Sequence, residues 1–287
     1  MKPGTNPFRQ FVLAHAKLWR QGLWLPLGRP QRFPPRPGPR ARAPKVLIFS
    51  PHPDDECIVG GLALRLLREA KWNVINVAVT LGSNPERRVA RLREVKDACD
   101  YLGFDLALSN RLELRPDTPR NNPAYWQKAV KNIGRLLAIS RPRVIFIPHA
   151  GDGHPVHVTT HRLVLAALKT LPKSFRCQVV ETEFWGQMAN PNLLVESSVA
   201  DVADLIGALA CHVGEVRRNP YHTRLPAWLM DNVRRGAEQV GGRGAAAPDF
   251  TFATIYRLRQ WARGRLMDGS KGRKFLPCAK NAAGLFR

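Results

Sequence analysis

The stretch Val46 to Glu56 reads V-L-I-F-S-P-H-P-D-D-E and decides how the rest of the chain is interpreted. Its first residues are apolar and predict a buried strand, while Gly60 and Gly61 introduce an apolar-periodic run that predicts a helix. The short loop between them carries a histidine and three consecutive acids. Because α/β proteins place their sites at the carboxyl ends of strands, this loop is a candidate functional site.

Two interpretations of the acidic loop are open. Acids that follow a strand often only cap the next helix. Three neighbouring carboxylates, however, repel one another unless a cation or hydrogen bonds compensate, and a divalent metal is such a cation. The spacing also lets His52 and Asp55 point to one centre, with Asp54 beside it.

A second histidine cluster follows another apolar strand much later in the chain. Residues 148–161 read P-H-A-G-D-G-H-P-V-H-V-T-T-H, a dense local concentration of imidazoles. For His149 and His161 we favour a structural role at a strand end and on a helix. One of the other histidines, together with His52 and Asp55, would complete a site of two histidines and one carboxylate. Such a site leaves positions open for water and substrate, as catalytic zinc sites do.

Strands and helices alternate from residue 46 onward. This alternation predicts an α/β fold, with a Rossmann-like, mostly parallel sheet flanked by helices in a single domain. We expect strands at 46–50, 74–80, 104–108, 143–147, 176–184 and 249–258, and helices after Gly60 and at 85–102, 124–139 and 199–210.

The net charge of +23 lies mostly at the two ends of the chain. Residues 1–45 hold ten Lys or Arg and no acid, and residues 263–287 hold seven and one acid. We therefore divide the chain into a basic amphipathic segment with a Pro/Arg-rich linker (1–45), an α/β catalytic domain (46–262) and a basic tail expected to be poorly ordered (263–287). Charge of this kind favours anionic surroundings, such as phospholipid head groups or nucleic acid.

Residues 7–25 place aromatic, aliphatic and basic side chains at near-helical spacing. Our first expectation is a helix packed on the domain, and the alternative is an interfacial helix on an anionic membrane surface. The five cysteines are odd in number and lack CxxC spacing, which favours a reducing compartment. No apolar run reaches the length of a membrane span. We expect a cytoplasmic protein, with a peripheral position on the inner face of a membrane as the variant that the basic N-terminus suggests.

Three motifs resemble one known family. They are S-P-H-P-D-D-E at 50–56, R-L-R-E-V-K-D-A-C-D-Y-L-G at 91–103 and D-G-H-P-V-H at 152–157. Together they resemble the PIG-L/LmbE-like zinc-dependent N-acetylglucosaminyl deacetylases, over roughly Lys45 to Leu168. The resemblance implies an LmbE-like fold and a metal-dependent N-deacetylase, a hydrolase that removes an N-acetyl group from an N-acetylglucosamine-type sugar or sugar conjugate.

The resemblance also implies roles for individual residues. His52, Asp55 and His157 would bind one Zn²⁺ ion per chain, or another divalent metal. Asp54 would be the general base that takes a proton from the metal-bound water. His154 would stabilise the oxyanion and protonate the leaving amine.

One residue departs from the family pattern. Val156 stands where the family has an acid between the two histidines, an acid that would orient or charge a neighbouring imidazole. Asp152 is the residue that would substitute for it from the other side.

Substrate contacts are expected from two further regions. Arg87, Arg88 and Arg91 follow the second strand, where the family has a substrate-contacting arginine, although a solvated helix face is the alternative for each. Residues 211–244 are rich in His, Tyr, Trp and Arg, which suits either a carbohydrate or phosphate pocket or a helix-turn packed on the sheet. The expected substrate-binding residues are Arg87, Arg91, Asp152, His222 and Arg224, and His212 and Tyr221 are further candidates in the 211–244 region.

Two other functional classes stay open. Val156 allows a catalytically weak or inactive member of the fold that acts as a metal-binding scaffold. The basic ends allow a nucleic-acid-binding protein, which would bind any duplex in a salt-dependent way. No stacking motif or recognition helix supports the second class, so the expected partner is an N-acetylated sugar or glycoconjugate and not nucleic acid. The sequence makes no prediction of the oligomeric state.

Overall fold

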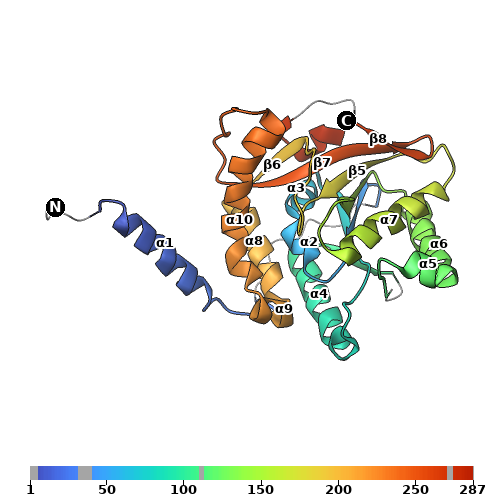
Figure 1. Ribbon diagram of the computed structural model, residues 1–287, viewed down its shortest axis with the longest axis horizontal. Helices are drawn as coiled ribbons and strands as arrows, with labels where there is room; N and C mark the ends of the chain where they lie inside the picture. The colour runs from blue at the N-terminus through green and yellow to red at the C-terminus, as the bar shows by residue number, and fades with distance from the viewer. Residues whose placement is uncertain (1–5, 32–40, 110–112, 270–273, 287) are drawn as a thin grey trace.

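A computed structural model of the protein describes residues 6–31, 41–109, 113–269 and 274–286 (Figure 1). One sheet forms the centre, and helices pack on both of its faces. Its strands are β1 (Lys45–Ser50), β2 (Asn73–Ala78), β3 (Asp105–Leu108), β4 (Val144–Pro148), β5 (Cys177–Thr182), β6 (Leu193–Ser197), β7 (Phe252–Ala262), β8 (Arg265–Asp268) and β9 (Lys274–Leu276).

The helices fall into an N-terminal helix, those that connect the parallel strands, a later group that precedes β7, and a 3-10 helix that follows β9. They are α1 (Arg9–Gly22), α2 (Asp55–Ile58), α3 (Gly61–Ala70), η1 (Pro85–Arg87), α4 (Arg88–Leu102), α5 (Thr118–Asn121), α6 (Pro123–Ser140), α7 (Pro155–Lys169), α8 (Val199–Ala210), α9 (Val213–Arg218), α10 (Tyr221–Gly236), the π-helical turn η2 (Ala237–Gly241) and η3 (Ala282–Phe286).

The order of the strands creates a crevice beside β1. The sheet runs β3-β2-β1-β4-β5-β7-β6-β9, and β8 pairs with β7. Strands β1 to β5 are parallel, and the chain moves outward from β1 to β3 before it crosses back to β4 on the other side of β1. At such a switch point the loops that follow the two central strands diverge and leave room for a ligand. The acidic loop follows β1, and the histidine-rich loop follows β4.

Strand β1 shows why the sheet needs helices on both faces. Val46 and Ile48 belong to a core cluster shared with α3, α4, α8 and α10. Leu47 and Phe49 belong to a second cluster shared with α6 and α7. Because successive side chains of a strand point to opposite faces, a wholly apolar strand must be covered on both.

The predicted fold class is confirmed: a single α/β domain with a mostly parallel, Rossmann-like sheet. The prediction missed β6 and gave β7 only as a last strand or edge at 249–258. Strand β7 runs antiparallel between β5 and β6 inside the sheet. Helices α8 and α10 separate these strands in sequence, so local patterning alone did not reveal their pairing.

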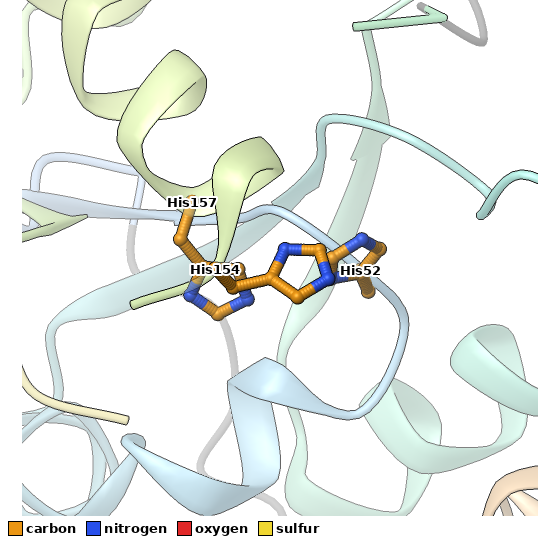
Figure 2. Close-up of side chains that lie close together, drawn as sticks. All are labelled: His52, His154 and His157. Atoms are coloured by element: carbon orange, nitrogen blue, oxygen red, sulfur yellow. The ribbon is translucent and has the colours of Figure 1, made fainter. Parts of the chain in front are cut away.

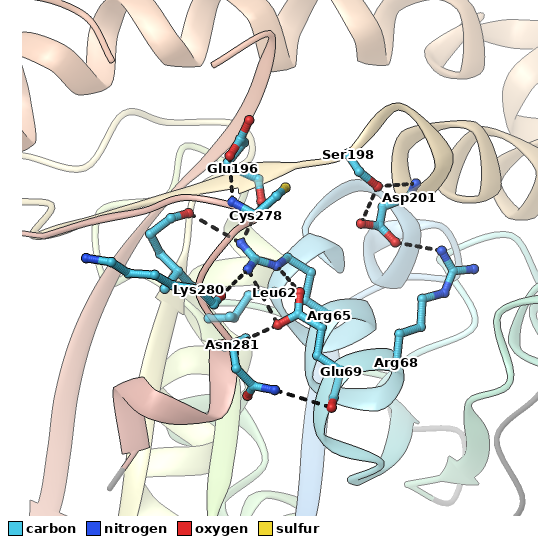
Figure 3. A network of polar contacts seen from close by, with 12 residues as sticks. Leu62, Arg65, Arg68, Glu69, Glu196, Ser198, Asp201, Cys278, Lys280 and Asn281 are labelled. Atoms are coloured by element: carbon cyan, nitrogen blue, oxygen red, sulfur yellow. Dashed lines mark hydrogen bonds and ion pairs between the residues drawn. The ribbon is translucent and has the colours of Figure 1, made fainter. Parts of the chain in front are cut away.

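The C-terminal segment differs from the expected poorly ordered tail. Residues 265–286 form β8, β9 and η3 in their described parts, and Leu285 and Phe286 are buried. Arg65 of α3 is 1% exposed and its guanidinium holds this segment (Figure 3). It donates hydrogen bonds to the backbone carbonyls of Leu276 (3.3 Å), Pro277 (3.1 Å) and Lys280 (2.7 Å). A basic composition therefore did not prevent order, because a buried arginine supplies donors to the segment's carbonyls.

The N-terminal segment also differs from the first expectation. Helix α1 contains no buried residue, so it is not a helix packed on the domain through an apolar face. It extends away from the rest of the molecule and joins it near α9 and α10 (Figure 1). Residues 32–40 of the expected Pro/Arg-rich linker lie outside the described residues. Within the described parts of the chain, no helix has the length and apolar character that crossing a membrane requires.

Candidate active site

The loop after β1 is strained at the residue expected to act as the base. Asp54 has φ 114°, in the left-handed region that residues other than glycine rarely adopt. Its backbone N–H donates to Oε2 of Glu56 (3.1 Å), and the helix α2 begins at the next residue. Strain of this kind persists only when surrounding contacts impose it, and it occurs often at functional sites.

Three histidines from the two loops converge at the crevice. Figure 2 shows His52 from the loop after β1 beside His154 and His157 from the start of α7. One nitrogen from each ring lies within 4.8 Å of one from each of the others. The rings of His52 and His157 have centroids 5.3 Å apart, so the two expected metal ligands are neighbours.

Asp55 links two of these histidines. Its Oδ2 accepts a hydrogen bond from the backbone N–H of His52 (2.7 Å) and lies 3.7 Å from Nδ1 of that ring. Its Oδ1 lies 3.5 Å from Nε2 of His157. Burial raises the pKa of Asp55, but His157 and His52 more than offset this and lower it below the ordinary value. The carboxylate is therefore ionised, as a metal ligand must be.

Two polar atoms at this point have no partner. Asp55 Oδ1 and His157 Nε2 are both buried and make no hydrogen bond. Unpartnered buried polar atoms are uncommon in native proteins and often mark an ion or a water. Carboxylate oxygen and imidazole nitrogen are both good zinc ligands. The residues present therefore fit a divalent metal held by His52, Asp55 and His157.

Asp152 lies behind His157 and not in the substrate cleft. Its Oδ2 lies 3.5 Å from Nδ1 of His157, and its oxygens accept backbone N–H groups of His154 (3.0 Å) and Trp185 (3.3 Å). Metal-binding histidines usually donate their second ring nitrogen to such a carboxylate. The expected substrate contact of Asp152 is thus corrected, because its side chain is fully used in orienting His157 and the loop. It provides the carboxylate that Val156 cannot.

His154 is the N-cap of α7. Its Nδ1 accepts the backbone N–H of Val156 (3.2 Å), so in the neutral ring the hydrogen is on Nε2. Burial and the neighbouring rings of His52 and His157 lower the pKa of His154 to about 4. The imidazole is neutral at pH 7, whereas protonation of the leaving amine by His154 would call for an imidazolium.

Asp54 lines the cleft beside the expected metal ligands His52, Asp55 and His157. Burial, and next the adjacent charge of Asp55, raise its pKa well above the ordinary value. A raised pKa is the direction expected of a carboxylate that accepts a proton near neutral pH. Tyr221 of α10 lines the same cleft, and the pKa of its hydroxyl is raised by burial and then by the charge of Asp54.

The cleft has a volume of about 600 Å³. Asp55 and His157 lie deeper, while His52, Asp54 and His154 form its inner end. Among the described residues that line it are five arginines and three carboxylates. They are Arg87, Arg88, Arg91, Arg115 and Arg218, with Asp54, Glu113 and Glu215.

Glu215 of α9 holds the arginines of the cleft wall. Its Oε1 lies 2.9 Å from Nη1 of Arg87 and 3.3 Å from Nη2 of Arg91, and its Oε2 contacts Arg218. Gly82 adopts φ 85°, and a Cβ there would lie 1.9 Å from Nη1 of Arg91, so only glycine lets this guanidinium pack. Arg87 and Arg91 both line the cleft, and their expected contact with substrate stays a prediction.

The other two expected substrate contacts lie elsewhere in the described structure. His222 is buried, does not line the cleft, and neither of its ring nitrogens has a hydrogen-bond partner. Arg224 stacks on the ring of Trp19 in α1, with 5.0 Å from its Cζ to the ring centroid. Both residues are on α10, but Tyr221 is the residue of that helix that faces the cleft. Neighbouring residues of a helix point in different directions, and the abundance of polar residues did not show which of them face the cleft. The substrate contacts predicted for His222 and Arg224 were wrong for this reason.

Sequence reasoning assigned no site role to Arg115, Arg218 or Trp185, which also line the cleft. Only tertiary structure brings them there, since each belongs to a separate loop or short helix. The structural role favoured for His149 and His161 agrees with their contacts. Nε2 of His149 lies 2.8 Å from the carbonyl of Gly186, and Nδ1 of His161 lies 2.8 Å from that of Pro148.

A second buried group adjoins the first. Nε2 of His212 lies 2.8 Å from Oε1 of Glu56, and Sγ of Cys57 lies 3.5 Å from the same oxygen. All three side chains are buried. Burial raises the pKa of the Cys57 thiol well above its ordinary value, which favours the neutral thiol.

Comparison with known proteins was made by family and by fold. The sequence model of the family described as PIG-L: GlcNAc-PI de-N-acetylase matches residues 47–168. A curated relative, the 1D-myo-inositol 2-acetamido-2-deoxy-alpha-D-glucopyranoside deacetylase of Mycobacterium leprae, is 27% identical over 176 residues. That match covers 51% of this chain and 57% of the relative, so the chain spans little more than half of the relative's length.

Solved structures show the same fold. The N,N'-diacetylchitobiose deacetylase of Pyrococcus horikoshii has a TM-score of 0.55 at 17% identity, covering 90% of this chain and 94% of its own. The 4-carboxy-2-hydroxymuconate hydratase of Pseudomonas putida has the same TM-score at 15% identity, covering 75% and 95%. At such identities the likeness establishes the fold alone, and the hydratase shows that this fold carries more than one reaction.

Proposed function

We propose, from the match of the PIG-L: GlcNAc-PI de-N-acetylase family model to residues 47–168, that the chain is a metal-dependent N-deacetylase of an N-acetylglucosamine-type conjugate. One observation carries the proposal: Asp55 Oδ1 and His157 Nε2 face each other, buried and unpartnered, behind a cleft that Asp54 lines. The curated relative that supports it is named as a deacetylase of an acetamido sugar linked to myo-inositol.

His52, Asp55 and His157 are proposed to hold the metal, for which zinc is the best match to the ligand set. When bound, zinc lowers the pKa of water to near 7 and polarises a carbonyl oxygen. Asp152 lies 3.5 Å from Nδ1 of His157 and favours the hydrogen on that nitrogen, which would leave Nε2, 3.5 Å from Asp55 Oδ1, to bind the metal.

Asp54 is proposed as the base. Its carboxylate lines the cleft at the residue next to a proposed ligand, and the left-handed backbone at this position sets its direction. It takes the proton of the attacking water as the oxygen bonds to the amide carbon. The same proton can then pass to the amine as the C–N bond breaks, so that acetate and a free amine leave.

His154 is proposed to donate a hydrogen bond to the developing oxyanion. Because its Nδ1 is used by the backbone of Val156, the hydrogen on Nε2 is the one available. A neutral donor in a half-buried position stabilises an oxyanion without itself changing charge. In this proposal the amine receives its proton from Asp54 and not from His154.

The cleft wall supports a conjugate that carries an anionic group. Five arginines and three carboxylates line it, and Arg87 and Arg91 are already paired with Glu215. Arg88 pairs with Glu113 (2.7 Å) and Arg218 with Glu215, while Arg115 lies on the same wall; planar guanidinium groups recognise carboxylates and phosphates by paired hydrogen bonds.

Acetate release from matched N-acetylglucosamine conjugates would test the proposal. The panel should contain a neutral aglycone, a carboxylate-bearing one and a phosphodiester-bearing one. We expect release from all three, with kcat/KM highest for an anionic member, and we expect Arg115→Gln to reduce that preference with little change for the neutral conjugate. No release from any conjugate by the zinc-loaded protein would support the metal-binding scaffold instead.

A further inference from the structure

Helix α1 and the residues just after it expose large apolar side chains. Phe8 is 71% exposed, Leu18 69% and Trp24 88%, and no residue of α1 is buried. Single exposed apolar residues are common on protein surfaces, but a contiguous exposed group usually marks an interaction site. This group is also continuous in sequence, from Phe8 to Leu27.

The helix divides its polar and apolar residues between two sides. At about 100° per residue, Phe11, Val12 and Leu18 fall on one face, while Lys17 and Arg20 fall on the other. The whole segment 1–45 contains no acid. An apolar face bordered by basic side chains is the pattern of helices that lie in the interface of an anionic bilayer.

One end of α1 is attached to the wall of the cleft. Arg224 of α10 stacks on Trp19, and a Cβ at Gly22 would lie 3.0 Å from Cγ2 of Thr223. Gly28 then donates its N–H to the carbonyl of Ala210 (2.9 Å). Figure 1 shows the helix projecting from this attachment, away from the sheet. Because α10 also supplies Tyr221 to the cleft, α1 and the candidate active site share one supporting helix.

We propose that α1 binds the surface of an anionic phospholipid bilayer and so holds the domain at the membrane. The apolar face inserts among the acyl chains near the head groups, and Lys17 and Arg20 pair with lipid phosphates. A second copy of the chain is a poorer occupant, because α1 packed on another α1 would bring like charges together with no acid to neutralise them.

Vesicle flotation with the full-length, zinc-loaded protein would test this proposal. The probes are vesicles of phosphatidylcholine alone and of phosphatidylcholine with about 30% phosphatidylglycerol, at about 0.15 M salt. We expect flotation only with the anionic vesicles. Changing Phe11 and Leu18 together to serine should weaken binding by about a hundredfold, since each buried apolar side chain contributes about a factor of ten or more.

Two matched variants separate membrane binding from general effects. Ile139→Ser removes an apolar side chain that is 72% exposed on α6, and flotation should be unchanged. Lys17→Gln with Arg20→Gln should weaken binding about thirtyfold, since each basic residue near the surface contributes about 1 kcal/mol, or a factor of about five. Since α1 buries no side chain, all variants should melt at the wild-type temperature and keep the wild-type rate on a soluble substrate.

The proposal is overturned if the wild-type protein stays unbound with anionic vesicles, or if the Phe11/Leu18 variant floats as the wild type does. It is also overturned if light scattering shows a dimer that the Phe11/Leu18 variant converts to a monomer, because a second copy would then cover α1. Binding to duplex DNA that is lost in the Lys17/Arg20 variant, without flotation, would equally replace the bilayer as the partner.

Discussion

Asp55 and Glu56 are consecutive residues, and each meets a histidine from far along the chain, yet the two pairs are built differently. Asp55 keeps one oxygen without a hydrogen bond, opposite the equally unpartnered Nε2 of His157. Glu56 uses both of its oxygens, one with Nε2 of His212 and one with the backbone N–H of Asp54. Both oxygens of Glu56 are therefore already hydrogen-bonded, whereas Asp55 keeps one oxygen for a metal; Nδ1 of His212, like Nε2 of His157, makes no hydrogen bond.

The difference teaches what separates a metal site from a structural pair when the residue types are the same. Behind the cleft, Asp55 Oδ1 and His157 Nε2 lie 3.5 Å apart without a hydrogen bond, and Asp152 orients the imidazole from the other side. At the second group, His212 and Glu56 are fully buried and lie within hydrogen-bond distance of each other. We therefore expect the Asp55 group to bind the metal and the Glu56 group to hold the strained loop in place.

The largest expected effect comes from removing a proposed ligand. Asp55→Ala or His157→Ala should abolish acetate release, because the remaining donors cannot hold the metal tightly. The measurement is acetate release at saturating substrate with added zinc. Acetate release near the wild-type rate in either variant would show that the Asp55–His157 pair does not hold the metal.

The next effect separates the base from the ligands. Asp54→Asn should lower kcat by about 10²- to 10⁴-fold while the bound metal is retained, since a general base contributes about that much. Single-turnover acetate release together with metal analysis of the same sample measures both quantities. Loss of the metal in this variant would instead make Asp54 part of the binding group.

The Glu56–His212 pair should affect the stability of the fold and not the metal content. Glu56→Ala leaves Nε2 of His212 and the N–H of Asp54 buried without partners, which should cost about 3–5 kcal/mol of unfolding free energy. Denaturant titration of the metal-free protein measures this cost. The matched control is Glu113→Ala, whose carboxylate is 65% exposed and which should change stability by less than about 1 kcal/mol.

Glu215 is a third carboxylate for this comparison, and its charge is compensated by neighbouring arginines. Burial raises its pKa, but Arg91, Arg218 and Arg87 more than offset this and lower it below the ordinary value of 4.5. A carboxylate with a lowered folded-state pKa stabilises the fold above its unfolded pKa, and this stability is lost as the pH falls through the folded pKa.

Glu215→Gln should therefore cost about 1.5–3 kcal/mol at pH 7, and the difference from wild type should shrink as the pH falls below about 4.5. Thermal or denaturant unfolding of both proteins at several pH values provides the measurement. A stability difference that does not change between pH 7 and pH 3 would mean that the charge of Glu215 contributes nothing.

The sequence predicted the parts of the molecule that depend on local pattern. Two loops that each come directly after an apolar strand predict one shared site, with His52, Asp54 and Asp55 on the first loop, whereas the choice of His157 on the second comes from the family resemblance. The structure brings the two loops together because parallel strands place their carboxyl ends at one edge of the sheet.

What the sequence did not predict depends on contacts between distant segments. The second partner of His157 is Asp152 within the same loop, which spacing alone offered only as a substitute for a missing acid. The order of the C-terminal segment depends on Arg65, a basic residue in a helix that gives no sign of its partners. Both ends of the chain are basic. Among the described residues, the buried Arg65 holds the C-terminal segment, whereas α1 at the N-terminal end buries no residue.

The zinc content of three proteins purified side by side, wild type, Asp55→Ala and Glu56→Ala, tests the central claim most directly. We expect about one zinc per chain in wild type, almost none in Asp55→Ala, and about one in Glu56→Ala despite its lower stability. Equal zinc in wild type and Asp55→Ala, with loss in Glu56→Ala, would place the metal at the buried Glu56–His212 group and contradict the account.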